Sequence, residues 1–387
     1  MLEELELAYE ESDADMRGGR HRRRRKRGGR SLFALVVVLA LLAGLGGAGY
    51  WGVGKVRGFF TAEDYPGSGD GSVQVQVKTG QGLAEIGNTL YAKHVVKSAG
   101  AFVDACGENP NATSIQPGYY KLRLHMKASL AVGLLLDLKN RISTKITIPE
   151  GKTTNATLTL LAKALKLPLG DFKDAVKDPG ALGIGDNWFT RSDHKKVTKS
   201  VEGFLFPDTY QFDPGTTAKD ALGQMVDRFM QNATDTGLDK PSGITPYDAL
   251  IVASLVQGEG LPKDMPKVAK VIYNRLDSPD EWMHKLQFDS TTNYWLDKNG
   301  DGARESRDLT SAQLHDKSNP YNTTEHAGLP PGPIDSPGAI AMRAATHPAE
   351  GNWLYFVRIN KDGTSAFTDD YDVQQANERK AEQNGAG

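Results

Sequence analysis

The sequence contains only one cysteine, Cys106, among its 387 residues. A single thiol cannot form an intrachain disulfide, which excludes the class of small disulfide-stabilised scaffolds. The eight histidines show no H-E-x-x-H or comparable ligand spacing, so the sequence gives no sign of a catalytic metal site. We therefore expect no metal and no other cofactor, and any catalysis must rest on other side chains.

Charged residues are also absent from residues 31–54, where Leu, Val and Ala dominate. About 20 apolar residues suffice to cross a bilayer as a helix. The stretch follows an acidic head and then a basic cluster at 17–30, RGGRHRRRRKRGGR. Alone, this cluster would indicate nucleic-acid binding, but directly before an apolar span it is better explained by the positive-inside rule. The sequence predicts a cytoplasmic tail over 1–30, a transmembrane helix over 31–54, an extracytoplasmic remainder and no nucleic-acid partner.

A cleaved signal peptide is the alternative explanation of this N-terminus. The densest apolar run, residues 32–45, is short and is followed by GGAG, as in many signal peptides. Tyr50 and Trp51, however, lie where an interfacial aromatic belt would, and no A-x-A cleavage site is evident. We therefore favour a retained anchor in the cytoplasmic membrane.

The length, with 39% hydrophobic and 24% charged residues, is enough for two or more domains. Residues 55–71 end in AEDYPGSGDG, a polar, glycine-containing stretch that is typical of a linker. Alternating valines over 73–77 then predict a strand, followed by a TGQG turn and a helix over 83–93. Because this order of short strands and helices is similar to the LysM type of glycan-binding module, we expect a LysM-like subdomain over 72–145.

A related pattern recurs about seventy residues downstream. The segments VKTGQGLAEIGNTL at 77–90 and IPEGKTTNATLTLL at 148–161 share a strand end, a glycine at the same place and an apolar-periodic helix. The two glycines are Gly80 and Gly151. The pattern favours duplication of a small strand and helix unit, with convergence on a common turn as the alternative.

Between the two copies, the segment IQPGYYKLRLHMKASLAVGLLLDLKN is expected to form a turn, a short strand and a helix. Leu130, Leu134 and Leu138 recur in it at helical spacing. We expect these leucines to lie in the core of the subdomain rather than to bind a ligand.

The segment TPYDALIVASLVQGEG at 245–260 carries the strongest helix signals. Thr245 suits the N-cap, Pro246 the first helical position, and Asp248 completes a T-x-x-D capping box. Glu259 falls on the apolar stripe of this helix, whereas Gln257 points elsewhere. A carboxyl group against aliphatic side chains has a raised pKa and can act as a general acid near neutral pH. Spacing alone favours a solvated Glu259 at a frayed helix end, so other segments must decide between the two.

Four segments combine unusual residue choices: VEGFLFPDTYQF at 201–212, the helix at 245–260, LQFDSTTNY at 286–294 and NPYNTTEHAGLPPGPIDSPG at 319–338. The last is rich in Pro and Gly and therefore forms a stiff loop rather than a central strand or helix. Three of them mix aromatic rings with Asp, Asn, Gln or Thr, a combination that suits carbohydrate clefts. Each segment alone could be a structural corner, but together they indicate one groove.

These segments identify a family resemblance. Residues from about 73 to 380 resemble the YceG-like family, the endolytic peptidoglycan transglycosylases known as MltG. The matching stretches are IPEGKT, EGFLFPDTY, ASLVQGEG, VIYNRL, QFDSTTNY, YNT with GLPPGPIDSPGA, and HPAEGNWLYFV. The resemblance implies an α+β protein with one membrane span, a LysM-like part and a catalytic domain over 146–387. Many relatives read E-K-E where this chain has Gln257, Gly258 and Glu259, so the family's catalytic acid is carried onto Glu259 alone.

The resemblance further implies a lytic cut of the MurNAc-GlcNAc bond that leaves a 1,6-anhydroMurNAc end and terminates nascent strands. Gln287, Asp289, Tyr321 and Asn322 are the candidates for positioning the glycan, and Glu202 and Asp208 are interpreted as structural. The expected partners are peptidoglycan glycan strands and the cytoplasmic membrane, with peptidoglycan synthases and division proteins as candidates. Two alternatives stay open: a hydrolytic muramidase with Asp289 or Glu202 as second carboxylate, and a non-catalytic peptidoglycan-binding scaffold.

One motif lies outside this resemblance. DKNGDGARESRD at 297–308 fits a D-x-N-x-D-G calcium loop with Asp308 at the twelfth place, where EF-hands usually have Glu. Polar turns rich in Asp, Asn and Gly also arise for other reasons. We favour an insertion loop over a calcium site, and any calcium bound there would be structural rather than catalytic.

Overall fold

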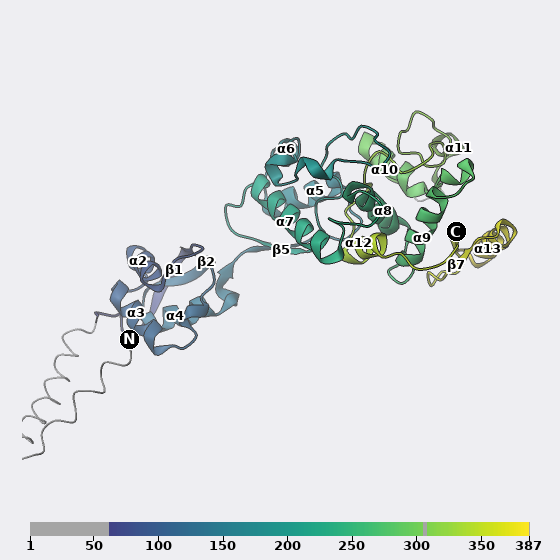
Figure 1. The fold of residues 1–387 in the computed structure, drawn as a ribbon. Helices are drawn as coiled ribbons and strands as arrows, with labels where there is room; N and C mark the ends of the chain where they lie inside the picture. Colours follow the sequence, from purple (N-terminus) through teal and green to yellow (C-terminus); the bar gives the residue numbers. More distant parts are fainter. Residues whose placement is uncertain (1–61, 305–307, 387) are drawn as a thin grey trace, which may run out of the picture.

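The computed structural model describes residues 62–304 and 308–386. The tail, the transmembrane helix and the first part of the linker expected from the sequence lie outside these residues. In the described part of the chain, no helix is both long and apolar enough to cross a membrane. The described residues combine helices with three small antiparallel sheets (Figure 1). This combination confirms the α+β class.

The N-terminal body has its own sheet and its own hydrophobic core. Strand β1 pairs antiparallel with β2, whose other edge pairs with β3. Because β1 begins at Ser68, its first residues fall within the expected linker, whereas the helix expected over 83–93 is confirmed as α2. The elements are β1 (Ser68–Val77), α2 (Leu83–Ala92), α3 (Ala99–Glu108), η1 (Ala112–Ser114), β2 (Gly118–Met126), α4 (Ala128–Leu136), η2 (Leu138–Asn140) and β3 (Arg141–Ile142).

The prediction that three leucines of the α4 region lie in this core was wrong for two of them, Leu130 and Leu138. Leu130 is 44% exposed and Leu138, beyond the helix end, is 53% exposed. Leu134 is partly buried and packs against the core, as predicted. A second apolar face of the same helix packs on the core instead, made of Ala128, Ala131, Val132 and Leu135. Because this segment is apolar on both faces, its spacing could not show which face is buried.

Residues 144–304 and 308–386 form the second body, in which two short strand pairs lie at the edges of a group of helices (Figure 1). Strand β4 pairs antiparallel with β5, and β6 pairs antiparallel with β7. The strands are β4 (Thr144–Thr147), β5 (Thr209–Phe212), β6 (Tyr355–Arg358) and β7 (Ser365–Thr368). The helices are α5 (Thr154–Leu165), α6 (Leu169–Ala175), α7 (Ala218–Thr236), α8 (Pro246–Glu259), α9 (Met265–Leu276), α10 (Asp289–Asn299), α11 (Ser311–Leu314), α12 (Ala339–Thr346) and α13 (Tyr371–Asn384), with the 3-10 turns η3 (Gly180–Leu182), η4 (Asp186–Trp188) and η5 (Glu281–His284).

The order strand, glycine turn, helix, helix and antiparallel partner strand occurs in both bodies. It runs β1, α2, α3, β2 in the first and β4, α5, α6, β5 in the second. The turn glycines, Gly80 and Gly151, both have left-handed backbones, with φ of 79° and 70°, which glycine adopts most readily. The strand, glycine turn and helix predicted for each of the two copies are therefore present in both bodies.

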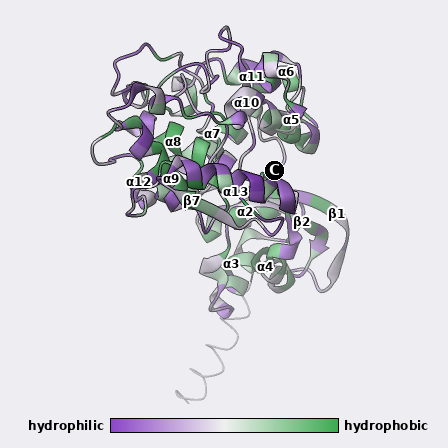
Figure 2. Ribbon diagram, turned by 90° about the vertical axis from the view of Figure 1, so that its right-hand side faces the viewer, coloured by the Kyte–Doolittle hydropathy of each residue, from purple (hydrophilic) through white to green (hydrophobic). Residues whose placement is uncertain are grey.

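Helix α8 lies at the centre of the second body and packs against α9, α10 and α12 (Figure 1). Every residue from Tyr247 to Val256 is buried. Figure 2 shows this hydrophobic helix enclosed by other elements, whereas α13 is largely hydrophilic. The sequence predicted a single apolar stripe, but the helix is buried on every side, as expected for a helix without a polar face. Its C-terminal end is therefore fixed in place by the surrounding elements.

Candidate active site

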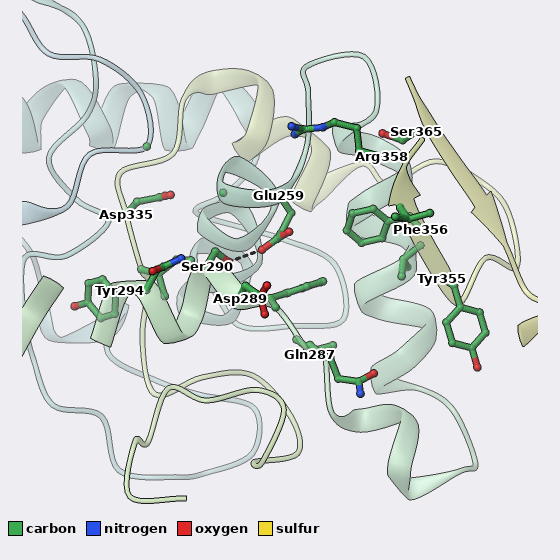
Figure 3. Close-up of a pocket in the computed structure, with 18 of the residues that line it drawn as sticks. Glu259, Gln287, Asp289, Ser290, Tyr294, Asp335, Tyr355, Phe356, Arg358 and Ser365 are labelled. Atoms are coloured by element: carbon green, nitrogen blue, oxygen red, sulfur yellow. Dashed lines mark hydrogen bonds between the residues drawn. The ribbon is translucent and has the colours of Figure 1, made fainter. Parts of the chain in front are cut away.

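A cavity of about 1470 Å³ opens at the C-terminal end of α8. Its walls come from segments far apart in the sequence: the turn after β4, the start of α10, the Pro-rich loop before α12, the β6–β7 hairpin and α13. Figure 3 shows the side chains of Glu259, Gln287, Asp289, Asp335 and Arg358 around this space. A cavity of this size is large enough to hold several linked sugar rings or a comparable polymer segment.

The predicted N-cap at Thr245 and first helical position at Pro246 are confirmed, whereas the Asp248 carboxylate, expected to complete a capping box, has other donors. The Asp248 backbone N–H donates to Thr245 Oγ1 at 3.1 Å, and Pro246 occupies the first turn. The Asp248 carboxylate accepts hydrogen bonds from the Thr245 hydroxyl and from the Ser192 backbone N–H, both at 2.8 Å. The cap therefore joins the helix start to a neighbouring loop as well as satisfying its own first turn.

Glu259 is the last residue of α8 and lines the cavity in a partly buried position. Ser290 Oγ donates a hydrogen bond to Glu259 Oε1 at 2.5 Å (Figure 3). Burial raises the pKa of Glu259, and the negative charge of Asp289 raises it further, while Ser290 and Arg358 act in the opposite direction. The predicted rise of the pKa is confirmed, and the interpretation of Glu259 as a solvated helix end was wrong. A carboxyl group in this setting retains its proton to a higher pH than usual, as a general acid requires.

The residues just before Glu259 position it. A Cβ on Gly258 would lie 3.3 Å from the Ser290 Cβ, so a larger residue would push α8 away from the hydrogen-bonding serine. Gln257 points away from the cavity, as predicted, and its Oε1 accepts a hydrogen bond from the Gly338 backbone N–H at 3.0 Å. Gln257 therefore fastens the Pro-rich loop to α8.

Two of the four predicted glycan-positioning residues lie in the cavity with Glu259. Gln287 lines the wall with a left-handed backbone, φ of 60°, and its Oε1 accepts a hydrogen bond from Arg275 Nη2 at 2.8 Å. Asp289 is the first residue of α10 and also lines the wall. The segment QFDSTTNY therefore supplies the side of the cavity that faces the end of α8.

Two further buried carboxyl groups lie close enough to influence each other. Glu202 accepts hydrogen bonds from the Thr154 backbone N–H at 2.9 Å and from Tyr294 Oη at 3.2 Å, yet burial raises its pKa to about 7. Asp335 lines the cavity, and burial together with the charges of Glu202 and Glu259 raises its pKa well above its usual range. Sequence reasoning assigned no role to Asp335, because an aspartate in a Pro-Gly loop is usually a turn residue. The only feature of the sequence that pointed to Asp335 was its position in the family motif GLPPGPIDSPG.

Comparison with known proteins identifies the family of this chain. Residues 75–380 match the model of the YceG-like family. The chain belongs to this family. It is 29% identical over 313 residues to the endolytic murein transglycosylase of Bacillus subtilis, covering 77% of this chain and 81% of that protein.

Two other YceG-like relatives extend the comparison. The chain is 28% identical over 367 residues to the endolytic murein transglycosylase of Streptococcus pneumoniae, covering 89% of this chain but only 64% of that protein. It therefore spans less than two thirds of the streptococcal relative. The crystal structure of a YceG-like protein from Listeria monocytogenes matches with a TM-score of 0.51 and 25% identity, covering 79% of this chain and 99% of the other.

The other two predicted glycan-positioning residues of this YceG-like chain lie away from the cavity wall. Tyr321 is buried, and its ring packs on Tyr294 with 4.8 Å between centroids. Asn322 is fully buried, and its Nδ2 donates to the carbonyl oxygens of Leu314 and Asp316 at 2.9 and 3.1 Å. The structure therefore does not bring Tyr321 and Asn322 together with Glu259. Both residues instead stabilise the part of the chain between α11 and the prolines at 330–333.

Two further acidic residues that the sequence singled out, Asp208 and Asp297, have structural contacts. Asp208 pairs with Arg228 Nε at 2.7 Å, in agreement with its structural interpretation. Asp297, the first residue of the calcium-loop pattern, lies in α10, and its Oδ2 accepts a hydrogen bond from Thr153 Oγ1 at 3.1 Å. Among residues 62–304 and 308–386, no three or more His, Cys, Asp or Glu side chains gather as a metal site would require. Asp297 joins α10 to the turn after β4.

Proposed function

We propose that this chain is a membrane-anchored endolytic murein transglycosylase that cuts the MurNAc-GlcNAc bond within peptidoglycan glycan strands. The relatives named endolytic murein transglycosylase support the reaction class. The observation that carries the proposal is Glu259, a partly buried carboxyl group with a raised pKa in the wall of a cavity of about 1470 Å³.

The chemistry needs one carboxyl group that first donates and then accepts a proton. Glu259 protonates the glycosidic oxygen as the bond from C1 of MurNAc to that oxygen breaks, and the bonding electrons remain on the oxygen. The C6 hydroxyl of the same sugar attacks C1, and the Glu259 carboxylate takes its proton. Because the nucleophile is part of the substrate, its effective concentration is high and no water is consumed. The product is a 1,6-anhydroMurNAc end.

A hydrolytic muramidase is the second candidate, because the charge of Asp289 acts on Glu259 from the same cavity. Such an enzyme uses a second carboxylate to activate water or form a covalent intermediate. Digestion of glycan strands in oxygen-18 water separates the two reactions by mass spectrometry. We expect muramic ends that are lighter by one water and carry no label. Reducing ends labelled with oxygen-18 would show hydrolysis instead.

Ser290 tunes the proton affinity of Glu259. Ser290→Ala removes a hydrogen bond that favours the ionised carboxylate, so the pKa of Glu259 rises further and its acid form persists to higher pH. We expect the alkaline limb of the pH–rate profile to move to higher pH. Ser365→Ala, which alters another serine of the cavity wall, is the control and should leave the limb in place. An unchanged limb in Ser290→Ala, or a shift to lower pH, would contradict this role.

The anchor belongs to the same proposal. The basic cluster and the uncharged stretch at 31–54 support a single span with a cytoplasmic N-terminus and an extracytoplasmic cavity. In that position the enzyme would cut nascent strands beside peptidoglycan synthases and division proteins. Cell fractionation tests the anchor, and a soluble exported form beginning near residue 50 would contradict it.

A further inference from the structure

Asp335 has an unusual environment for a carboxyl group that the proposed reaction does not use. Its side chain is 6% exposed, yet it lines the cavity that holds Glu259 and extends toward the end of α8 (Figure 3). Asp335 Oδ1 is buried and has no hydrogen-bond partner among the described residues. Buried polar atoms in proteins are almost always bonded. Because Asp335 Oδ1 lies unbonded in the wall of a cavity, we interpret it as a group that hydrogen-bonds to a ligand bound in that cavity.

The backbone around Asp335 is fixed on both sides. The Ile334 N–H donates to Ser254 Oγ at 3.1 Å, and the Gly338 N–H donates to Gln257 Oε1 at 3.0 Å. Both acceptors belong to α8, the helix that ends in Glu259. Asp335 is thus held at a set position relative to Glu259 by the helix that carries the proposed acid. Preorganisation of this kind is expected of groups that contact a substrate.

The opposite side of the loop is fixed by the turn after β4. Gly151 N–H donates to the Ser336 carbonyl and Ser336 N–H donates to the Lys152 carbonyl, both at 3.0 Å. These bonds leave the side chain of Asp335 free to face the cavity while its main chain is immobilised. The loop is therefore a rigid support for one carboxyl group.

The surroundings also determine the charge of Asp335. Glu202 and Glu259 are the charged groups that act on it most, and both are carboxyl groups that oppose its ionisation. Burial opposes ionisation as well. Both effects raise the pKa of Asp335 and favour its protonated form, and a protonated carboxyl group is a hydrogen-bond donor rather than only an acceptor.

We propose that Asp335 contacts the bound glycan directly and donates a hydrogen bond to the acetamido carbonyl oxygen of an N-acetylated sugar beside the cut bond. This inference rests on the proposed function, which supplies the glycan. The amide carbonyl is the strongest neutral acceptor on such a strand, whereas hydroxyl and ring oxygens are weaker. Asp335 is thus a specificity residue that selects N-acetylated sugars and sets their register against Glu259.

Binding measurements on the full-length chain carrying Glu259→Gln test this assignment without cleavage of the ligand. The ligands are a chito-oligosaccharide and a cello-oligosaccharide of equal length, which share a β-1,4 backbone but differ in the acetamido group. We expect Asp335→Ala to weaken chito-oligosaccharide binding about tenfold or more, the loss expected when one buried hydrogen bond is removed. Asp335→Asn, whose amide still donates, should remain within about threefold of the parent. Cello-oligosaccharide binding should be unchanged in both variants.

Three results would overturn the proposal. Asp335→Ala could weaken binding of both sugars equally, which would indicate a structural role, or of neither, which would indicate no contact. Asp335→Asn could lose as much selectivity as Asp335→Ala, which would exclude a donor role. Melting temperatures of the variants identify any loss of affinity that is caused by unfolding. Because the side chain of Asp335→Asn is nearly identical in shape, this variant tests the donor role even if Asp335→Ala fails to fold. Because the readout is binding, failure of the cleavage mechanism would be seen separately, as absence of product from the wild-type chain.

Discussion

Glu259→Gln is expected to lower the rate of glycan cleavage by about 10²- to 10⁴-fold, because the amide keeps the shape of the side chain but supplies no proton to the leaving oxygen. The hydrogen bond with Ser290 can be retained by the amide oxygen, so the fold should be intact. The measurement is the release of muramic-ended fragments from purified glycan strands, followed by mass spectrometry.

Glu108→Gln provides the matched control for this experiment. Glu108 is also the last residue of a helix, α3, but lies exposed in the N-terminal body, away from the cavity. It should retain full activity. If the wild-type chain and Glu259→Gln release the same fragments, or if neither releases any, the enzyme assignment fails. Release by neither would leave a peptidoglycan-binding scaffold as the remaining interpretation.

Gly203→Ala is expected to lower the free energy of unfolding by about 2–4 kcal/mol, through a left-handed backbone and a steric clash together. Gly203 has φ of 86°, and a Cβ there would lie 2.8 Å from Pro333 Cβ and 3.2 Å from Leu250 Cδ2. Pro333 belongs to the loop that carries Asp335, and Leu250 belongs to α8. The substitution should therefore separate the loop from the helix, and cleavage activity should fall together with stability.

Gly215→Ala separates the two causes. Gly215 has the same φ of 86°, but a Cβ there would meet no atom within 4 Å. In Gly215→Ala only the strain of the left-handed backbone remains, so the free energy of unfolding should fall by about 1–2 kcal/mol. Denaturant unfolding of both variants gives the comparison. Equal losses would show that the clash of the added Cβ with Pro333 and Leu250 contributes nothing to the destabilisation.

Local signals in the sequence were sufficient to predict several structural features. The cap at Thr245, the helix that ends at Glu259 and the glycine turns at Gly80 and Gly151 each depend on residues within a few positions of one another. Such short-range rules do not require knowledge of the rest of the fold. The family motifs added Glu259, Gln287 and Asp289 as site residues, and all three line one cavity.

Other features depended on contacts between distant segments. The sequence placed Asn322 in the glycan site because its motif mixes aromatic and polar residues, but its amide group donates hydrogen bonds to the carbonyl oxygens of Leu314, at the end of α11, and Asp316. It placed Leu130 in the core, although a neighbouring apolar face of the same helix packs there instead. Composition and spacing could not predict the surroundings of Asn322 or Leu130, because these depend on which surfaces the rest of the chain covers.

The sequence by itself determined the α+β class, the family and the identity of the proposed acid, because caps, periodicity and motif order are encoded locally. Only the tertiary structure decided the environment of that acid. Ser290 and Asp335 lie far from Glu259 in sequence, yet Ser290 donates a hydrogen bond to it, and the Glu259 carboxylate contributes to the raised pKa of Asp335. The pKa of a carboxyl group depends on burial and on neighbouring charges in space, and neither follows from the order of residues along the chain.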